Sequence, residues 1–539
     1  MSISWANVEK ARRHLAREHG TVIKDWGGKL AVALVYPNSY YVGMSNLGVH
    51  VLYRLLNGYP DVVCERVFWE KDSASKKTLL LSVESQRPLS DFAVLAFSIS
   101  YELDYFYVVQ VLKASGIPLY ASQRDERHPL VIAGGPCVMA NPMPLTPFFD
   151  CLCNGEAEAI IPALLPLLSE GIGGEREILL KNLAALPGIY VPRNPPPSPV
   201  VRQFVRNLDD FPVHTTVLTP DTELGDLYLM EVERGCAWHC RFCLACSIFF
   251  PMRVRSMNSL IVQAGEGLKY RKRLGLVGAD VADYPHIEEL AQKLHEMGAL
   301  VSVSSLRVKP LSTAVLREMA HGTDTIALAP EAGSQRLRDI IRKGVTEDDI
   351  LTAMEKVAAE RIKQLKLYFM VGLPSETDED VADIVTLALK CKDVLDKQKA
   401  KCRIALNVSS FVPKAGTPFQ WLPMESVPTL NHRLTMLKSG LVPRGIQVKG
   451  ESPVWSEVQA VLAAGDARLA EVLVDMKTFS LAEWRRVLEQ HNLDIDTYAH
   501  QPRPTDKPLP WAVIDPGTKL ERLREEMERA LVNSNEVSN

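Results

Sequence analysis

The sequence predicts an α/β protein with two parallel-sheet domains and a mostly helical C-terminal region. Through the first 195 residues, short apolar runs that stop at glycine or proline alternate with helical segments, which is typical of a doubly wound, flavodoxin-like sheet. From about Leu224 the alternation repeats six times, which predicts a partial (βα)6 barrel of the TIM type. A proline-rich stretch separates the two patterns. We therefore expect domains at residues 1–195, 224–424 and 425–539, with a linker at 196–223.

Four apolar runs predict strands of the N-terminal sheet. They are KLAVALVYP from Lys29, FAVLAFSIS from Phe92, PLVIAGG from Pro129 and FFDCLCNG from Phe148. After the first run we expect Ser45 to cap a helix that ends before Gly58. Doubly wound sheets bind ligands at the carboxyl ends of their strands. The sequence therefore predicts a binding site at that edge.

The barrel strands are predicted from six further runs: LYLMEVERG, RLGLVGAD, LVSVSSLR, TIALAPEAGS, QLKLYFMVGLPSE and RIALNVSSFVPKAG. Two helices between them begin with capping-box patterns, at Thr346-Glu-Asp-Asp349 and Thr377-Asp-Glu-Asp380. Polar or charged residues follow each run. Because the carboxyl ends of barrel strands share one mouth, we expect these residues to meet there, although each alone is also explained as a loop residue or helix cap.

Barrel-type strands are expected to stop after Glu425. Amphipathic segments near residues 430–440, 452–464, 481–490 and 519–531 predict helices. These helices would form either a lid on the substrate side or a cap over the open edge of the barrel.

Composition narrows the class of protein. There are 61 Lys and Arg residues against 65 Asp and Glu, a net charge of −4, and no long basic run, so no clear nucleic-acid signal is present. Neither a signal-peptide pattern nor an apolar stretch of about 18 residues occurs, which predicts a cytoplasmic protein with no membrane partner. Its ten cysteines are then expected to stay reduced.

The most informative motif is Cys236-Ala-Trp-His-Cys240-Arg-Phe-Cys243. Three thiolates would leave one iron of a four-iron cluster open to a small molecule, which is how a cluster serves an enzyme. A structural zinc site usually needs a second ligand pair from a distant segment, and no such pair is present. Cys246 extends the run and would close the cluster or complete a zinc site. A closed cluster would indicate an electron-transfer or cluster-scaffold protein.

The Cys-x3-Cys-x-aromatic-Cys pattern, with Phe242 as the aromatic residue, resembles the signature of the radical S-adenosylmethionine (SAM) superfamily. The segments YPNSYYVGMSNLG, FSISYEL, IAGGPCVMANPMPL, PEAGSQRLR, KLYFMVGLPSETDED and FVPKAGTPFQW resemble a subfamily in which a cobalamin-binding-type domain precedes the barrel. The resemblance implies a [4Fe-4S] cluster on Cys236, Cys240 and Cys243, which cleaves SAM reductively to a 5′-deoxyadenosyl radical. It also implies a low-potential electron donor such as flavodoxin or ferredoxin.

By the same resemblance SAM lies at the barrel mouth. Asp280, with Gly278 beside it, would face the methionyl amine, Arg307 the carboxylate and Glu331 the ribose, although the last two roles could be reversed. The backbone at Gly372 would meet the adenine edge. Phe242, Ser305 and Ser334 complete the expected contacts, and Ser334 is equally explained as a helix cap.

The N-terminal domain departs from its family motif. The usual Asp-x-His-x-x-Gly reads Asn38-x-Tyr40-x-x-Gly43, so a phenol replaces the histidine that coordinates cobalt. The resemblance implies cobalamin without that ligand, with Ser98, Gly134 and Gly135 around its nucleotide tail; the glycines are equally explained by turns or close packing. With cobalamin, methyl transfer is expected. Without it, rearrangement, oxidation and sulfur insertion remain open, and the substrate could be a peptide, RNA, lipid or metabolite.

Overall fold

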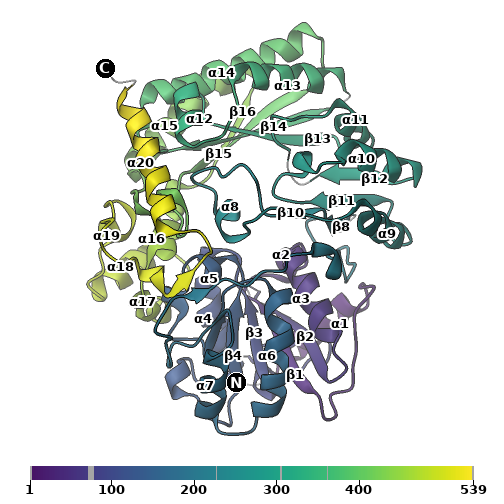
Figure 1. Cartoon of the computed structure of the whole chain (residues 1–539), viewed down its shortest axis with the longest axis vertical. Coiled ribbons are helices and arrows are strands. Elements are labelled where there is room, and N and C mark those ends of the chain that lie inside the picture. The colour runs from purple at the N-terminus through teal and green to yellow at the C-terminus, as the bar shows by residue number, and fades with distance from the viewer. Residues whose placement is uncertain (1–2, 71–77, 226, 304–305, 361, 537–539) are drawn as a thin grey trace.

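The computed structural model describes residues 3–70, 78–225, 227–303, 306–360 and 362–536. The N-terminal domain lies at one end of the molecule and the barrel at the other (Figure 1). The C-terminal helices run along one side and contact both. None of the described helices is both long and apolar enough to cross a membrane.

The N-terminal sheet has the predicted doubly wound form. Its strands pair in the order β2-β1-β3-β4-β5-β6, and every pairing is parallel except that of β6 with β5. The strands are β1 (Leu30–Tyr36), β2 (Val62–Phe68), β3 (Val94–Ser98), β4 (Leu130–Gly134), β5 (Cys151–Cys153) and β6 (Ile189–Tyr190). This order reverses direction between β1 and β3, where such sheets bind their ligands.

Strand β2 was not predicted, because Glu65 and Arg66 interrupt its apolar run. Every residue of β2 is nevertheless buried. The Arg66 guanidinium lies 2.7 Å from Glu18 and 2.7 Å from Glu84, and both carboxylates are also buried. A buried charge is tolerated only when it is paired, so this strand depends on partners that lie far from it in the sequence.

Helices cover both faces of this sheet: α1 (Trp5–Leu15), α3 (Leu47–Asn57), α4 (Tyr105–Ser115), α6 (Ala157–Gly171) and α7 (Arg176–Ala184), with the short α2 (Tyr40–Gly43) and α5 (Pro136–Ala140) at the strand ends. The expected cap of α3 was off by one residue. Asn46 accepts the Gly48 amide at 2.9 Å, whereas the Ser45 hydroxyl donates to the Tyr41 carbonyl. Both residues are good caps, and only the local backbone decides between them.

All six predicted barrel strands are present, in two parallel groups. The first is β12-β11-β8 and the second begins β13-β14-β15, and an isolated bridge from Leu306 to Leu328 links them. The strands are β8 (Leu227–Glu231), β11 (Arg273–Val277), β12 (Leu300–Val303), β13 (Thr325–Glu331), β14 (Gln364–Val371) and β15 (Arg403–Ser410). The barrel is therefore an open arc rather than a closed ring.

The barrel does not end at residue 424. A seventh strand, β16 (Gln447–Gly450), pairs in parallel with β15, so the expectation that strands stop after Glu425 was wrong. The strand is short, and its QVKG sequence has no apolar run that would reveal it. The barrel helices are α9 (Met257–Leu268), α10 (Ile287–Glu296), α11 (Thr313–Gly322), α12 (Gln335–Ile340), α13 (Glu347–Ala359) and α14 (Asp378–Lys397). Both predicted capping boxes, at Thr346 and Thr377, are formed.

The C-terminal region is mostly helical, as predicted. It contains α15 (Val427–Leu441), α16 (Pro453–Ala464), α17 (Leu469–Asp475), α18 (Leu481–Gln490), α19 (Ile495–Ala499) and α20 (Leu520–Glu536). Its strand β17 (Ile514–Asp515) pairs with β7 (Val200–Val201), which lies in the segment expected to be a linker. The Asn141 amide also donates to the carbonyls of Ala463 and Gly465. The region thus ties the N-terminal domain to the barrel.

Candidate active site

The four clustered cysteines lie within residues 235–246, which follow β9 (Glu233–Arg234) as a loop and enter the first turn of helix α8 (Leu244–Ile248). We call residues 235–246 the cysteine loop. It begins at Gly235, whose φ is +88°, and a Cβ there would lie 2.4 Å from the Phe249 carbonyl oxygen. Only glycine fits this turn, so the Arg-Gly-Cys entry has a steric reason. β9 pairs with β10 (Arg253–Val254), which closes the loop at its base.

The loop brings the thiols together. Cys246 on α8 hydrogen-bonds with the sulfurs of both Cys236 and Cys243. These bonds lower the pKa of Cys236 to about 6 and that of Cys243 to about 7. Cys240 lies 4.0 Å from Nη1 of Arg307, and burial raises the pKa of its thiol. Clustered thiols are the ligands that iron–sulfur clusters use, and two of these four have lowered pKa values, so this loop fits the expected group.

Two buried carboxyl groups stand beside the cysteine loop. Glu233 Oε1 accepts the backbone amide of Asp280 at 2.6 Å. Within the described part of the chain, neither carboxylate oxygen of Asp280 accepts a hydrogen bond, and nor does Oε2 of Glu233. Burial raises the pKa of Asp280 to about 7 and that of Glu233 to about 8. Among the described residues none of these three oxygens accepts a hydrogen bond, although Asp280 Oδ2 lies 3.4 Å from Arg307 Nε in an ion pair, so the carboxyls remain available to a cationic donor such as an ammonium group.

Gly278 leaves space for one of these two carboxyl groups. A Cβ at residue 278 would lie 2.6 Å from Cγ of Glu233. The glycine therefore makes room for the Glu233 side chain, a protein neighbour that sequence reasoning did not consider. Glu233 directly precedes Arg-Gly-Cys and follows a buried barrel strand. A charged residue in that position is expected at the barrel mouth, and this pattern could have identified Glu233 as a site residue.

Arg307 and Lys343 supply the positive charge of the mouth. Arg307 Nε lies 3.4 Å from Asp280 Oδ2, and the guanidinium stacks 3.9 Å above the ring of Trp238 in the cysteine loop. Arg307 also donates to the Lys343 carbonyl, and Lys343 Nζ pairs with Glu331 at 3.0 Å. The structure thus brings Asp280, Arg307 and Glu331 together near the cysteines. Trp238 and Lys343 were not predicted, because no sequence pattern marks either of them as a site residue.

Glu331 has an unusual backbone. Its φ is +71° at the end of β13, where the register with β14 shifts. Left-handed backbone in a residue other than glycine is costly and is concentrated at functional sites. The strain turns the Glu331 side chain to Lys343 and so into the barrel mouth.

Three other expected contacts have structural partners of their own. The Ser334 hydroxyl accepts the Leu337 amide as the cap of α12 and donates to Asp380 at 2.5 Å. The Gly372 amide donates to Glu376 at 2.5 Å, which occupies the backbone group expected to meet adenine. Phe242 packs against an apolar cluster on the barrel. Ser305 lies outside the described residues.

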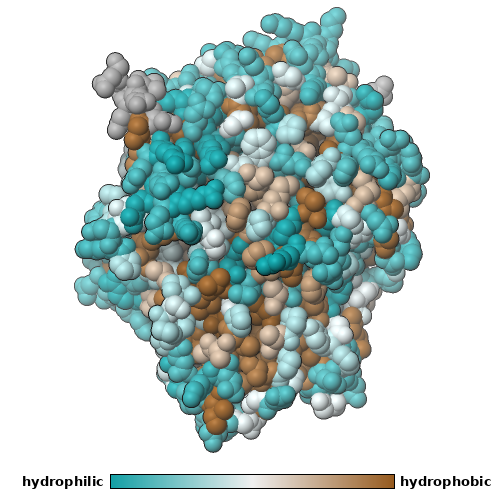
Figure 2. Space-filling model, in the orientation of Figure 1, coloured by the Kyte–Doolittle hydropathy of each residue, from teal (hydrophilic) through white to brown (hydrophobic). Residues whose placement is uncertain are grey.

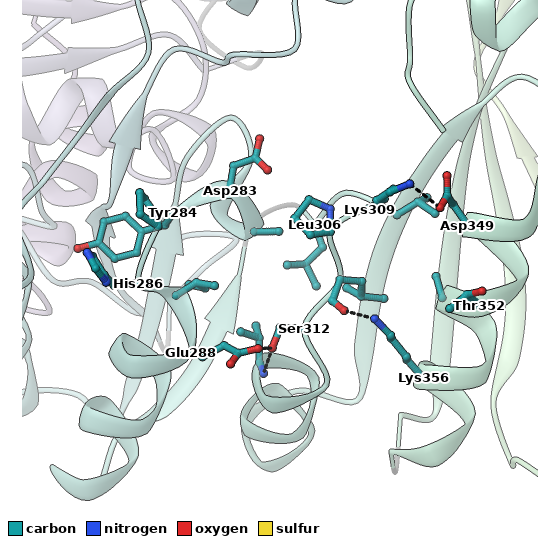
Figure 3. Close-up of a pocket in the computed structure, with 18 of the residues that line it drawn as sticks. Asp283, Tyr284, His286, Glu288, Leu306, Lys309, Ser312, Asp349, Thr352 and Lys356 are labelled. Carbon is teal, nitrogen blue, oxygen red and sulfur yellow. Dashed lines mark hydrogen bonds and ion pairs between the residues drawn. The ribbon is translucent and has the colours of Figure 1, made fainter. Parts of the chain in front are cut away.

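A cavity of about 850 Å³ lies between the start of α10, residues 306–312 and α13 (Figure 3). Its wall includes Asp283, which accepts the Trp238 indole N–H. Most of its other polar side chains also have partners, among them Lys309 with Asp349 at 2.9 Å and Ser312 with Glu288 at 2.5 Å. This internal pairing leaves few polar groups for a ligand.

A second cavity, of about 410 Å³, opens at the carboxyl ends of β1, β3 and β4, between α3 and α6. Ser98, Gly134 and Gly135 line it, as expected for the binding edge of this sheet. Most of its lining is apolar, with residues such as Val94 and Ile132, and Figure 2 shows hydrophobic residues gathered over this domain. We call this space the sheet-edge cavity. No histidine is among its lining residues in the described chain.

Asn38, Tyr40 and Gly43 do not line the sheet-edge cavity. The Tyr40 hydroxyl donates to Glu18 at 2.6 Å, and its ring stacks on His14 at 3.8 Å. Asn38 donates to Asp104 at 2.8 Å, and a Cβ at Gly43 would lie 2.4 Å from the Phe68 ring. All three residues therefore serve the packing of the β1–α3 connection, with Tyr40 turned away from the cavity.

Ion pairs and hydrogen bonds join the N-terminal domain to the barrel near the sheet-edge cavity and the cysteine loop. Lys414 at the end of the sixth barrel strand pairs with Glu102 of the N-terminal domain at 2.6 Å, and Gln459 of α16 donates to the same carboxylate at 2.9 Å. Arg234 reaches Glu156 at 2.9 Å and Glu158 at 2.8 Å. These contacts fix the sheet edge against the barrel mouth.

Comparisons with known proteins agree with this architecture. Residues 48–192 match a family model described as the N-terminal part of radical SAM proteins, and residues 230–388 match the radical SAM superfamily model. The chain is 31% identical over 446 residues to the uncharacterized protein MJ0966 of Methanocaldococcus jannaschii, covering 82% of this chain and 90% of the relative.

A relative and a solved structure match the chain at lower sequence identity. An uncharacterized methyltransferase of Pyrococcus horikoshii, PH0819, is 25% identical and is matched over 48% of this chain and 58% of its own length. The structure of the radical SAM methyltransferase TsrM from Kitasatospora setae shares the fold, with a TM-score of 0.52 and 13% identity over 86% of this chain and 99% of TsrM. The chain thus belongs to the radical SAM superfamily, in a subfamily that carries an N-terminal α/β domain before the barrel.

Proposed function

We propose that this radical SAM enzyme holds a [4Fe-4S] cluster on Cys236, Cys240 and Cys243, binds SAM beside it, and holds cobalamin in the sheet-edge cavity. The product would be a methylated substrate. When bound, the cluster supplies the electron that cleaves SAM, and cobalamin supplies a carrier for the methyl group. A low-potential donor such as flavodoxin or ferredoxin would reduce the enzyme.

One observation carries this proposal: the sheet-edge cavity opens toward the cysteine loop. Phe249, which directly follows α8, lines the cavity, and so does Val277, which directly precedes Gly278. A ligand in the cavity would therefore lie next to the loop that carries the cysteines and next to the segment that leads to Asp280. Two cofactors that exchange a group need such adjacency.

The residues of the mouth have separate roles in the proposed complex. The Asp280 and Glu233 carboxylates would accept hydrogen bonds from the methionyl ammonium of SAM. Arg307 would hold the methionyl carboxylate, with Trp238 fixing its plane. Glu331, held by Lys343, would accept from the ribose hydroxyls. The carbonyls and side chains that already engage Arg307 keep it in place before SAM arrives.

The sheet-edge cavity suits the nucleotide tail of cobalamin. Its apolar walls would cover an aromatic base, and Gly134 and Gly135 leave the backbone open at the strand ends. TsrM was solved with cobalamin and a [4Fe-4S] cluster, and it and the Pyrococcus relative are both described as methyltransferases, which supports the proposal. Among the described residues none that lines the cavity is a histidine, so its walls would offer cobalamin no imidazole ligand.

The test is anaerobic reconstitution with iron, sulfide and cobalamin. After gel filtration the protein should keep its corrin absorbance, and with dithionite and methyl-labelled SAM it should label a component of a cell extract. Loss of all corrin absorbance would refute the cobalamin part. Formation of 5′-deoxyadenosine without label transfer would leave a radical SAM enzyme of another reaction type.

A second candidate is a closed-cluster electron carrier, and one contact favours it. Cys246 hydrogen-bonds with two of the three expected ligands, so it is near enough to be a fourth. Cys246→Ala separates the two candidates. An open-cluster enzyme would keep its iron and its SAM cleavage, whereas a closed carrier would lose cluster integrity.

A further inference from the structure

We propose that His295, Glu318 and His321 form a site for a divalent zinc-type cation, at the end of the barrel opposite the cysteine loop. The site is separate from the proposed cluster, SAM and cobalamin sites. It would join helices α10 and α11, which cover β11 and β12.

The three side chains already converge. His295 Nδ1 lies 2.7 Å from Glu318 Oε2, and His321 Nδ1 lies 3.7 Å from the same oxygen. One ligand atom from each residue falls within 4.8 Å of the other two. Ligands around a tetrahedral zinc ion, with bonds of about 2.0–2.1 Å, are separated by roughly 3.3 Å. Small rotations of these exposed side chains would therefore accommodate the metal.

The fold explains why these residues meet. Glu318 and His321 are three positions apart on α11, so they share one helix face. His295 is in the last turn of α10, which packs against α11 (Figure 1). Both histidines are thus near helix C-termini, where the partial negative charge of the helix ends favours a cation. The Glu318 carboxylate adds a full negative charge.

The donor set selects the metal. Two imidazoles and one carboxylate are ligands that zinc uses, whereas magnesium and calcium prefer oxygen ligands. Three protein ligands leave a fourth position for water. Among the described residues, these side chains form hydrogen bonds or ion pairs only with one another, so metal binding would break no other such contact.

The consequence is mechanical. α10 and α11 cover the three-stranded half of the split barrel, and the opposite ends of β11 and β12 lead to Asp280 and Arg307. A metal that joins the last turns of the two helices would restrain this half without touching the reacting groups. We therefore expect zinc to raise thermal stability and to leave SAM cleavage unchanged.

The test uses holoenzyme with its cluster reconstituted, so that Cys236, Cys240 and Cys243 are occupied. Calorimetric titration with zinc chloride should show one bound ion, and magnesium chloride should give no uptake. His295→Ala and His321→Ala should each weaken zinc binding about tenfold or more, and they should abolish the zinc-dependent rise in Tm. Iron content measured after each titration verifies that zinc has not displaced the cluster.

Two further variants make the outcome decisive. His286→Ala removes a histidine from the other end of α10 and should bind zinc as the wild type does. Glu318→Gln keeps the side-chain size, so its lost zinc affinity could not be attributed to misfolding. The proposal would be overturned if the wild type, His295→Ala and His321→Ala bound zinc with equal stoichiometry and affinity. It would also be overturned if the wild type took up no zinc.

Discussion

Glu233 accepts the backbone amide of Asp280 at 2.6 Å, and this contact ties the entrance of the cysteine loop to the end of β11. It places two buried carboxyl groups side by side, and in the described chain three of their oxygens accept no hydrogen bond, although Arg307 forms an ion pair with Asp280 at 3.4 Å. Such an arrangement is expensive in the free protein and is relieved when a cation enters. The free-energy gain on SAM binding would come from this relief.

Replacing Asp280 with alanine should raise the Kd for SAM about tenfold or more, because an ammonium would lose a charged acceptor. Iron content should stay at the wild-type level, since Asp280 does not bind the cluster. Equilibrium binding of labelled SAM to reconstituted protein measures the effect. Glu289→Gln, at an exposed position of α10, is the matched control. Unchanged SAM affinity in the Asp280 variant would remove this residue from the site.

SAM affinity should rise with pH between about 6 and 8. The pKa of Asp280 is raised to about 7 and that of Glu233 to about 8, so both carboxyls become charged across this window and then attract the ammonium. The affinity of the Asp280→Asn variant should depend less on pH. Binding measured at several pH values tests this, and a flat wild-type profile would contradict the assignment.

The same raised pKa values predict the opposite trend for stability without SAM. A buried carboxyl with a raised pKa binds its proton more tightly in the folded state, so the free energy of unfolding falls as pH rises from about 4 toward 8. Asp280→Asn should flatten this part of the profile. Denaturant unfolding of ligand-free protein at several pH values is the measurement, and an unaltered slope in the variant would count against the burial of this group.

The contact between Glu102 and Lys414 should matter for the union of the two domains. Both side chains are largely buried, and removing one partner leaves an unpaired charge, which costs about 3–5 kcal/mol. Glu102→Gln or Lys414→Met should therefore destabilise the protein more than the double variant does. A double-mutant cycle in urea measures the coupling. Additive effects would show that the pair does not join the domains.

Filling the sheet-edge cavity should abolish cobalamin retention. Ala96 on β3 lines the cavity, and phenylalanine there would occupy the space proposed for the nucleotide tail. Cluster content and SAM binding should survive in Ala96→Phe. Tyr40→Phe is the informative control, because Tyr40 faces Glu18 and His14 and its hydroxyl should be dispensable for corrin binding. Loss of corrin in the control alone would mean that the cofactor lies elsewhere.

The sequence was sufficient for most strands of the two sheets because they are apolar runs that end at proline or glycine, as β1 ends before Pro37 and β14 before Gly372. It missed β2, since Arg66 is compatible with a buried strand only when Glu18 and Glu84 are near in space. It missed β16, which has no apolar signal and is defined by its pairing with β15. Pairing between distant segments is invisible to local periodicity.

In the candidate site, too, some residues could be predicted from local sequence and others depend on contacts between distant segments. Asp280, Arg307 and Glu331 follow barrel strands, and the rule of a shared mouth was enough to group them. Lys343 and Trp238 lie in loops, and only the fold brings them to Glu331 and Arg307. Tyr40 was placed with cobalamin because it occupies a motif position, yet its partners come from α1 and the segment after it. A motif position fixes the backbone, and neighbouring elements decide where the side chain points.

The most direct test of the central claim is electron paramagnetic resonance of the reduced, reconstituted protein before and after SAM is added. An open iron predicts a [4Fe-4S] signal that changes when SAM binds, in the wild type and equally in Cys246→Ala, followed by formation of 5′-deoxyadenosine. A signal that is indifferent to SAM, and that disappears when Cys246 is replaced, would contradict the account.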